Sequence, residues 1–179
     1  MTRIPMFCAS LCLLVPVRAA EVIARFPEKV EVRLADPGLA AEAEALAAVM
    51  KLPGGRVDRA PAGGSPFYDP ATRTLRLPDD LVERLRRDLD RHAYGPQAGR
   101  DAAARDLALF VLAHELAHAG HDLLKLPDGE IEADRTAAQT LRKAFPRRAD
   151  AAIRTAIDYL NLCATPGDVK RAKALAAPM

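Results

Sequence analysis

The feature that most limits the fold of this chain is a long apolar segment, residues 101–124, with the spacing of a helix. Its large apolar side chains are Leu107, Phe110, Val111, Leu112 and Leu116. A helix that faces solvent carries apolar residues on one stripe only, so this segment is predicted to lie in the core. Ala, Leu and Arg dominate the composition, which favours further helices around it.

Shorter segments complete the expected fold. Helical periodicity and capping residues predict helices at residues 37–51, 80–92, 130–145, 147–162 and 168–176. Alternation predicts strands at residues 22–26, 30–34 and 73–77, with a short strand before the Asp69-Pro70 turn. Glycines and prolines make residues 53–66 an expected loop. Residues 20–179 are therefore predicted to form one α+β domain, with a small antiparallel sheet and a mostly helical body around the central helix.

The first nineteen residues have the composition of a cleaved secretory signal peptide. Arg3 precedes an apolar run over residues 4–17, and Ala19 ends a Val-Arg-Ala sequence suited to cleavage. A membrane anchor is the alternative, but the run is short for a bilayer and contains two prolines. We therefore expect a periplasmic or secreted protein with no stable membrane insertion after cleavage. Cys163 would be its only cysteine, so no internal disulfide is expected.

The charge balance indicates no polyanionic partner. The whole chain has 26 basic and 24 acidic residues. Arg3 and Arg18 account for the two excess basic residues, so the chain from residue 20 onward has 24 of each. Neither nucleic acid nor an anionic membrane surface is expected to bind such a chain.

Two histidines stand four residues apart in the central helix, His114 and His118, and Glu115 follows the first. Residues four apart share one helix face, so both imidazoles can reach one metal ion. Glu115 is rotated by about 100° from His114, where it can take a proton from a metal-bound water. Zinc lowers the pKa of such a water to about 7, so the pattern predicts a catalytic zinc site with Glu115 as general base.

A catalytic zinc site needs a third protein ligand, and the next expected helix supplies acidic candidates. Glu130 and Asp134 are four residues apart and share a face, whereas Glu132 points away from it. We expect Glu130 to be the third ligand and Asp134 to orient one ligand histidine through its free N–H. Glu132 and His121 stay open as alternative third ligands.

The order of these residues resembles a known arrangement. H-E-L-A-H at residues 114–118, followed by Glu130 and Asp134, is similar to the gluzincin pattern H-E-x-x-H and then E-x-x-x-D. Residues 67–141 also resemble a family of small secreted bacterial proteins, known as metallopeptidases within a domain of unknown function. Its motifs appear here as F-Y-D-P, H-E-L-A-H, D-L-L-K-L-P-D-G and E-I-E-A-D. The resemblance implies a zincin-like fold and a zinc ion (Zn²⁺) as cofactor.

The function expected from these residues is a secreted zinc-dependent metallopeptidase that acts on a peptide or protein. An oxyanion develops on the peptide carbonyl when water attacks it. The side chains that could stabilise this oxyanion are Tyr68, His92, Tyr94 and Tyr159. The strand at residues 73–77 could hold a substrate through its backbone. One alternative is a non-catalytic protein that binds a metal or a partner on the same fold. Another is a structural helical domain without metal.

Overall fold

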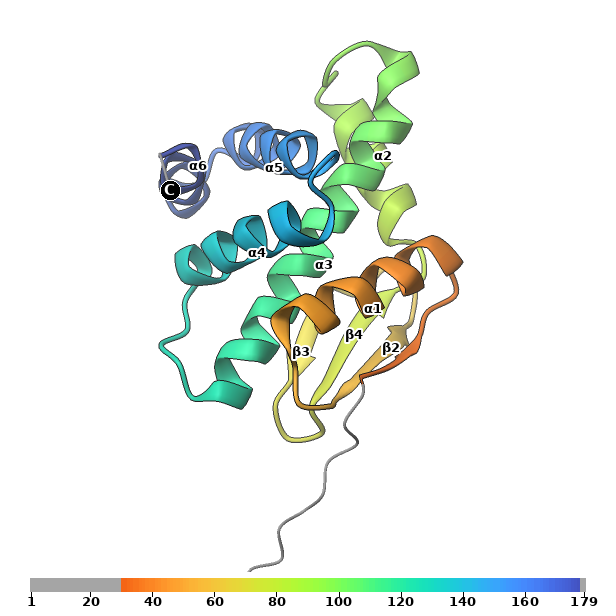
Figure 1. Ribbon diagram of the computed structural model, residues 1–179. Helices are drawn as coiled ribbons and strands as arrows, with labels where there is room; N and C mark the ends of the chain where they lie inside the picture. The colour runs from red at the N-terminus through yellow and green to blue at the C-terminus, as the bar shows by residue number, and fades with distance from the viewer. Residues whose placement is uncertain (1–29, 178–179) are drawn as a thin grey trace, which may run out of the picture.

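The computed structural model describes residues 30–177 as a mixed α+β fold (Figure 1). The expected signal peptide and the expected strand at residues 22–26 lie outside the described residues. The described residues form four strands: β1 (Glu31–Arg33), β2 (Arg56–Ala60), β3 (Phe67–Asp69) and β4 (Thr74–Pro78). They also form six α-helices: α1 (Pro37–Met50), α2 (Leu81–Arg91), α3 (Arg100–Leu124), α4 (Glu130–Ala144), α5 (Ala149–Cys163) and α6 (Pro166–Ala176).

The sheet is mixed, with strand order β1-β2-β4-β3, so the prediction of an antiparallel sheet was wrong for most of it. β1 pairs with β2 and β2 with β4 in parallel, and only β3 pairs with β4 in the antiparallel sense. β1 and β2 are joined through α1, and a helical connection returns the chain to the same end of the sheet, which makes the pair parallel. β2 itself lies inside the segment that was expected to be a loop.

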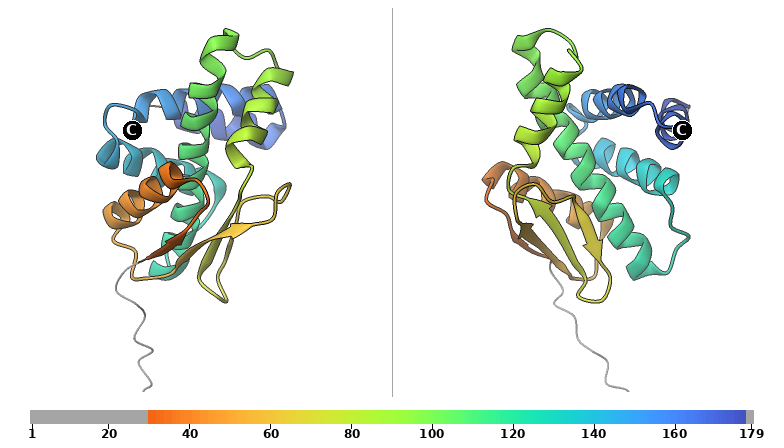
Figure 2. Two further views of the ribbon diagram at one scale, coloured as in Figure 1. Left: turned by 90° about the vertical axis from the view of Figure 1, so that its right-hand side faces the viewer. Right: turned by 180° about the vertical axis from the view of Figure 1, so that it is seen from behind.

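One face of the sheet is apolar and packs against helices. Val32, Val57, Leu75 and Tyr68 are neighbours across the four strands. Val57 and Leu75 are almost completely buried. Arg56, the residue directly before Val57 on β2, is exposed. Figure 2 shows α1 and the lower half of α3 on the same side of the sheet. The sheet therefore contributes one face to the core, as antiparallel and small mixed sheets do when the other face meets solvent.

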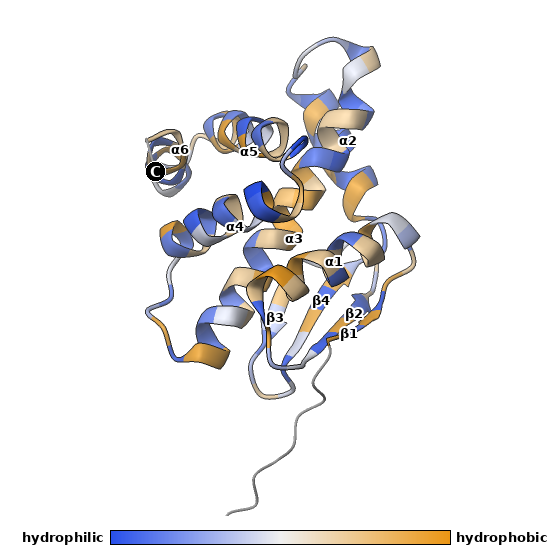
Figure 3. Cartoon of the chain, in the orientation of Figure 1, coloured by the Kyte–Doolittle hydropathy of each residue, from blue (hydrophilic) through white to orange (hydrophobic). Residues whose placement is uncertain are grey.

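α3 is the centre of the fold, as predicted. It runs between the sheet on one side and α4, α5 and α6 on the other (Figure 2), and its middle is apolar (Figure 3). Leu109 and Leu112 of α3 have no exposed surface. All six helices lie where the sequence predicts them, with small shifts at their ends. Among the described helices, none is both long and apolar enough to cross a membrane.

Candidate metal centre

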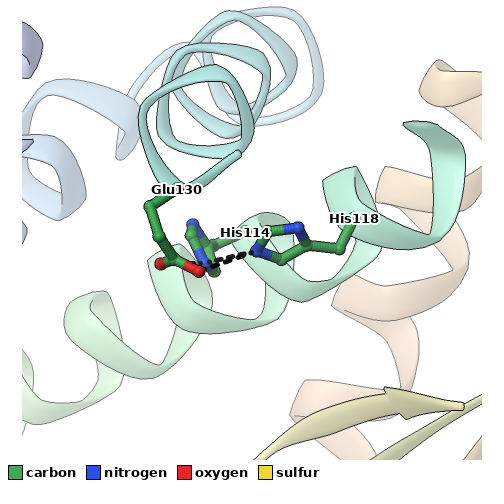
Figure 4. A group of neighbouring side chains, drawn as sticks. All are labelled: His114, His118 and Glu130. Atoms are coloured by element: carbon green, nitrogen blue, oxygen red, sulfur yellow. Dashed lines mark hydrogen bonds and ion pairs between the residues drawn. The ribbon is translucent and has the colours of Figure 1, made fainter. Parts of the chain in front are cut away.

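His114 and His118 lie one turn apart on α3 and direct their rings to the same point (Figure 4). Their Nε2 atoms are 3.0 Å apart. The rings meet edge to face, at 87°. His114 is buried and His118 is partly buried. The four-residue spacing therefore does bring two imidazole nitrogens together, as a shared helix face requires.

Glu130 approaches the two histidines from α4, of which it is the first residue. α3 ends at Leu124, and the left-handed backbone of the next residue, Lys125 (φ 54°), starts the turn that leads the chain back to α4. Glu130 Oε2 is 3.5 Å from His114 Nε2, and Oε1 is 3.6 Å from His118 Nε2. These three side chains form a group that could hold a metal ion, with the predicted third ligand among them.

The two alternative third ligands do not belong to this group. His121 is buried, and both of its ring nitrogens are engaged: Nδ1 is 2.9 Å from Asp128 Oδ1 and Nε2 is 3.0 Å from Thr136 Oγ1. Glu132 is exposed on α4. The structure therefore favours Glu130 over both, because only its carboxylate lies beside the two Nε2 atoms.

A carboxylate lies behind each of the two histidines. Asp134 Oδ1 is 2.8 Å from His114 Nδ1, as the sequence predicts, and Asp134 is completely buried. Burial alone would raise the pKa of Asp134, but its hydrogen bond from Arg171 and the neighbouring His114 hold that pKa below its usual value. Asp128 is hydrogen-bonded to His118 Nδ1 at 2.8 Å. Carboxylates in these positions fix the tautomer in which Nε2 is free to bind a metal.

Sequence reasoning missed two residues of this site, Asp128 and Arg171. Asp128 lies in the turn between α3 and α4, where it bonds both His118 and His121. Arg171 reaches the site from α6 and donates two hydrogen bonds of 2.8 Å to the Asp134 carboxylate. Its Nη1 is also 2.9 Å from Glu130 Oε2. The loop spacing could have suggested Asp128, but no local pattern marks Arg171.

Glu115 lies beside the group without belonging to it. Its side chain is partly buried and lines the same cleft as His114 and His118. Burial raises the pKa of the Glu115 carboxyl, while the charges of His114 and His118 act in the opposite direction. A carboxylate with a raised pKa, next to a candidate metal group and open to a cleft, is a candidate for proton transfer.

The cleft has a volume of about 1070 Å³, and its lining residues come from α3, from β3 and α2, and from α5 and α6. Of the four residues named for oxyanion stabilisation, Tyr68 and Tyr159 line it, whereas His92 and Tyr94 do not. The Tyr68 hydroxyl donates to Asp122, and burial raises the pKa of Tyr68 to about 12. Tyr68 therefore keeps its proton at neutral pH.

The expectation that residues 73–77 pair with a substrate backbone was wrong. Residues 74–77 belong to β4, which is paired on both sides, with β2 and with β3. The strand with a free edge next to the cleft is β3, which pairs only with β4 and contributes Phe67 and Tyr68 to the lining. A chain could add to the sheet only beyond β3 on this side.

Comparison with protein-family models, with curated proteins and with solved structures finds no match for this chain. The gluzincin resemblance therefore rests on the sequence motifs that carry it.

Proposed function

We propose that this protein is a zinc-dependent peptidase with a zincin-like fold, secreted through its N-terminal segment. The observation that carries the proposal is the convergence of His114, His118 and Glu130 at the wall of an open cleft, with Glu115 beside them. Three protein ligands of this kind leave one coordination position free, which is the pattern of catalytic rather than structural zinc sites.

The donor atoms fit a zinc ion in type and spacing. Tetrahedral zinc with bonds of about 2.0–2.1 Å separates its ligand atoms by roughly 3.3 Å. The two Nε2 atoms are 3.0 Å apart, and the Glu130 oxygens lie 3.5 and 3.6 Å from them. Two imidazoles and one carboxylate suit zinc, whereas calcium and magnesium prefer oxygen ligands alone.

The chain's own residues have distinct roles in the proposed reaction. When bound, zinc would polarise a peptide carbonyl and acidify a water molecule. Glu115 would accept the proton of the attacking water and pass it to the leaving amine. Asp134 and Asp128 would hold the imidazoles of His114 and His118 in the tautomer that binds the metal. The substrate is a peptide that lies extended in the cleft.

The test of this function separates metal binding from catalysis. The purified protein without residues 1–19 is expected to contain about one zinc ion per chain by elemental analysis, and Glu130→Ala is expected to lose most of it. Glu132→Gln, on the same helical turn and likewise exposed but outside the candidate ligand group, is the matched control and should retain the metal. Glu115→Gln should retain zinc and lose hydrolysis of a peptide library by at least about a hundredfold.

Two outcomes would contradict the proposal in different ways. If the wild type holds no zinc after reconstitution, neither a peptidase nor another zinc protein is supported. If zinc is retained but wild type and Glu115→Gln are equally inactive on every peptide, the non-catalytic alternative of a metal-binding or partner-binding protein is correct.

A further inference from the structure

Two arginines of α2, Arg84 and Arg87, line the same cleft as the candidate metal ligands. They share the face of α2 that turns to the cleft, since residues three apart are neighbours on a helix. Around them the cleft is apolar, with Leu81, Leu85, Leu107, Phe110, Ala156 and Leu160 in its lining. This part of the cleft therefore combines an apolar lining with two positively charged guanidinium groups. Arg84 and Arg87 are here called the arginine pair.

The protein itself offers few hydrogen-bond acceptors to the guanidinium groups of the arginine pair. Arg84 Nε is buried and makes no hydrogen bond among the described residues; its nearest carboxylate oxygen, on Asp80, is 3.7 Å away. The carboxylate oxygens nearest to Arg87 are 3.7 and 3.8 Å away. Hydrogen bonds from N–H groups to oxygen have lengths of about 2.7–3.2 Å, so none of these contacts is one. Both guanidinium groups retain donors for a further acceptor.

Arg86, on the same helix, shows the contrast. It does not line the cleft, and it donates hydrogen bonds of 2.9 Å to Glu83 and 2.7 Å to Asp90. The acidic side chains of α2 thus supply hydrogen-bond acceptors for an arginine on the face away from the cleft. Of the three arginines of α2 that line the cleft, Arg91 lies 3.1 Å from Asp88, whereas Arg84 and Arg87 have no carboxylate closer than 3.7 Å.

Acidic groups in this part of the cleft are already engaged. Asp88 lies on the same face of α2, but Arg91 is 3.1 Å from its carboxylate and the Tyr159 hydroxyl donates to it at 3.3 Å. The Arg91 and Asp88 charges cancel each other, and Asp80 and Glu83 approach the arginine pair only to 3.7–3.8 Å, so the N–H donors of the pair stay available to a carboxylate. A ligand with a carboxylate would therefore meet attraction there rather than repulsion.

The arginine pair is within reach of a peptide that lies at the candidate metal centre. Leu107, which lines the apolar part of the cleft, is seven residues before His114 on α3. Seven residues of helix span about 10 Å. An extended peptide advances about 3.3 Å per residue, so about three residues would bridge this distance.

We propose that the cleft selects peptides with an aspartate or glutamate side chain about three residues from the scissile bond, next to an apolar residue. The acidic side chain would accept hydrogen bonds from Arg84 and Arg87, and the apolar residue would lie on the floor beside them. Charge-assisted pairs with arginine are among the strongest hydrogen bonds in proteins, and they favour carboxylates over amides. This inference deepens the proposed peptidase function and rests on it.

The test measures binding and hydrolysis separately. Binding is measured on the zinc-loaded Glu115→Gln protein with two fluorescent mixtures of short peptides, identical except that one contains Glu where the other contains Gln. All peptides have amidated C-termini, so that only side-chain carboxylates are compared. The Glu mixture is expected to bind about tenfold more tightly, and the wild type to hydrolyse it about tenfold faster. The combined change Arg84→Gln with Arg87→Gln should abolish both preferences.

Matched variants separate the arginine pair from general charge effects. Arg86→Gln removes the same charge from the other face of α2 and should leave the preference unchanged. Replacement of both members of the pair by lysine should restore part of it. If the double glutamine variant unfolds, Arg87→Gln alone serves instead, because its side chain is half exposed. It should reduce the preference severalfold.

The outcomes distinguish this inference from the proposed function. Preferential binding of the Glu mixture without any hydrolysis supports the arginine pair and contradicts the peptidase. Hydrolysis of both mixtures at equal rates supports the peptidase and overturns the inference. A preference that survives loss of both arginines also overturns it.

Discussion

Four carboxylates surround the two candidate ligand histidines: Glu115, Asp128, Glu130 and Asp134. Within residues 30–177, one guanidinium, that of Arg171, compensates them at close range. The formal charge of this group is therefore −3 with neutral imidazoles, four negative charges against one positive. A divalent cation would reduce it to −1. Electrostatics thus favours a bound cation here independently of any motif.

The buried carboxylate of Asp134 predicts a pH dependence of stability. Its pKa is below the usual value, so the charged form stabilises the fold above the unfolded-state pKa of about 3.9, and this contribution is lost as the pH falls below that value. In the presence of a chelator, Asp134→Asn should lower the free energy of unfolding by about 3 kcal/mol at pH 5. The difference from wild type should shrink toward pH 2. Urea titrations at several pH values measure it, and a constant difference would contradict the assignment.

At the residue scale, the sequence predicted what a local spacing encodes. His114 and His118 share a helix face through their four-residue spacing, and Glu130 with Asp134 repeats that logic on the next helix. Arg171 follows Asp134 by 37 residues and meets it only because α6 packs against α4. No pattern in the sequence relates residues that tertiary packing alone brings together.

At the scale of elements, α6 is joined to α4 by the ion pair between Arg171 and buried Asp134. Arg171→Met should destabilise the protein by about 3 kcal/mol, because it leaves the Asp134 carboxylate buried without its cation. Combined with Asp134→Asn, the loss should be clearly less than the sum of the two single losses. Lys173→Met, on an exposed position of α6, is the control. Thermal or urea unfolding measures all four proteins, and additive losses would refute the pairing.

Gly120 sets how closely α3 approaches the chain after α1. A Cβ at this position would lie 3.2 Å from Leu52 Cδ2, which is tighter than ordinary packing. Gly120→Leu should therefore cost about 2 kcal/mol through overpacking. Leu52→Ala in the same chain should recover part of that loss by making room, although it is destabilising by itself. Denaturation of the three variants measures the coupling between the two positions, and independence of the two changes would contradict the close contact.

The helices and three of the four described strands were predictable, whereas β2 and the parallel pairing were not, for a physical reason. Helix periodicity is local, so the apolar spacing of α3 or the Asp36 cap of α1 can be recognised within a few residues. Parallel pairing instead joins Val57 of β2 to Leu75 of β4 across an intervening strand. β2 was missed because its five residues lie between glycine-rich and proline-rich flanks, which have the composition of a loop.

At the scale of the whole molecule, α3 connects the sheet to the C-terminal helices, so the fold should unfold as one unit. Leu112, at the middle of α3, has no exposed surface. Leu112→Ala should lower stability by about 3 kcal/mol, and the transitions followed by far-UV circular dichroism and by tyrosine fluorescence should shift together. Leu124→Ala, exposed at the end of the same helix, should change stability by less than about 0.5 kcal/mol. Two separated transitions would show that the sheet and the helices are independent.

The short length of β3 limits how many backbone hydrogen bonds the molecule can make to a bound polypeptide. This edge strand has three residues, and in an antiparallel ladder the backbone groups of successive residues alternate between the two sides. A polypeptide lying beside β3 would thus gain very few backbone hydrogen bonds, which every sequence can make equally well. Discrimination between chains must come from their side chains, and a cleaved chain would dissociate readily. If it acts as the proposed peptidase, such a molecule is suited to rapid turnover of a few preferred sequences rather than to retention of many.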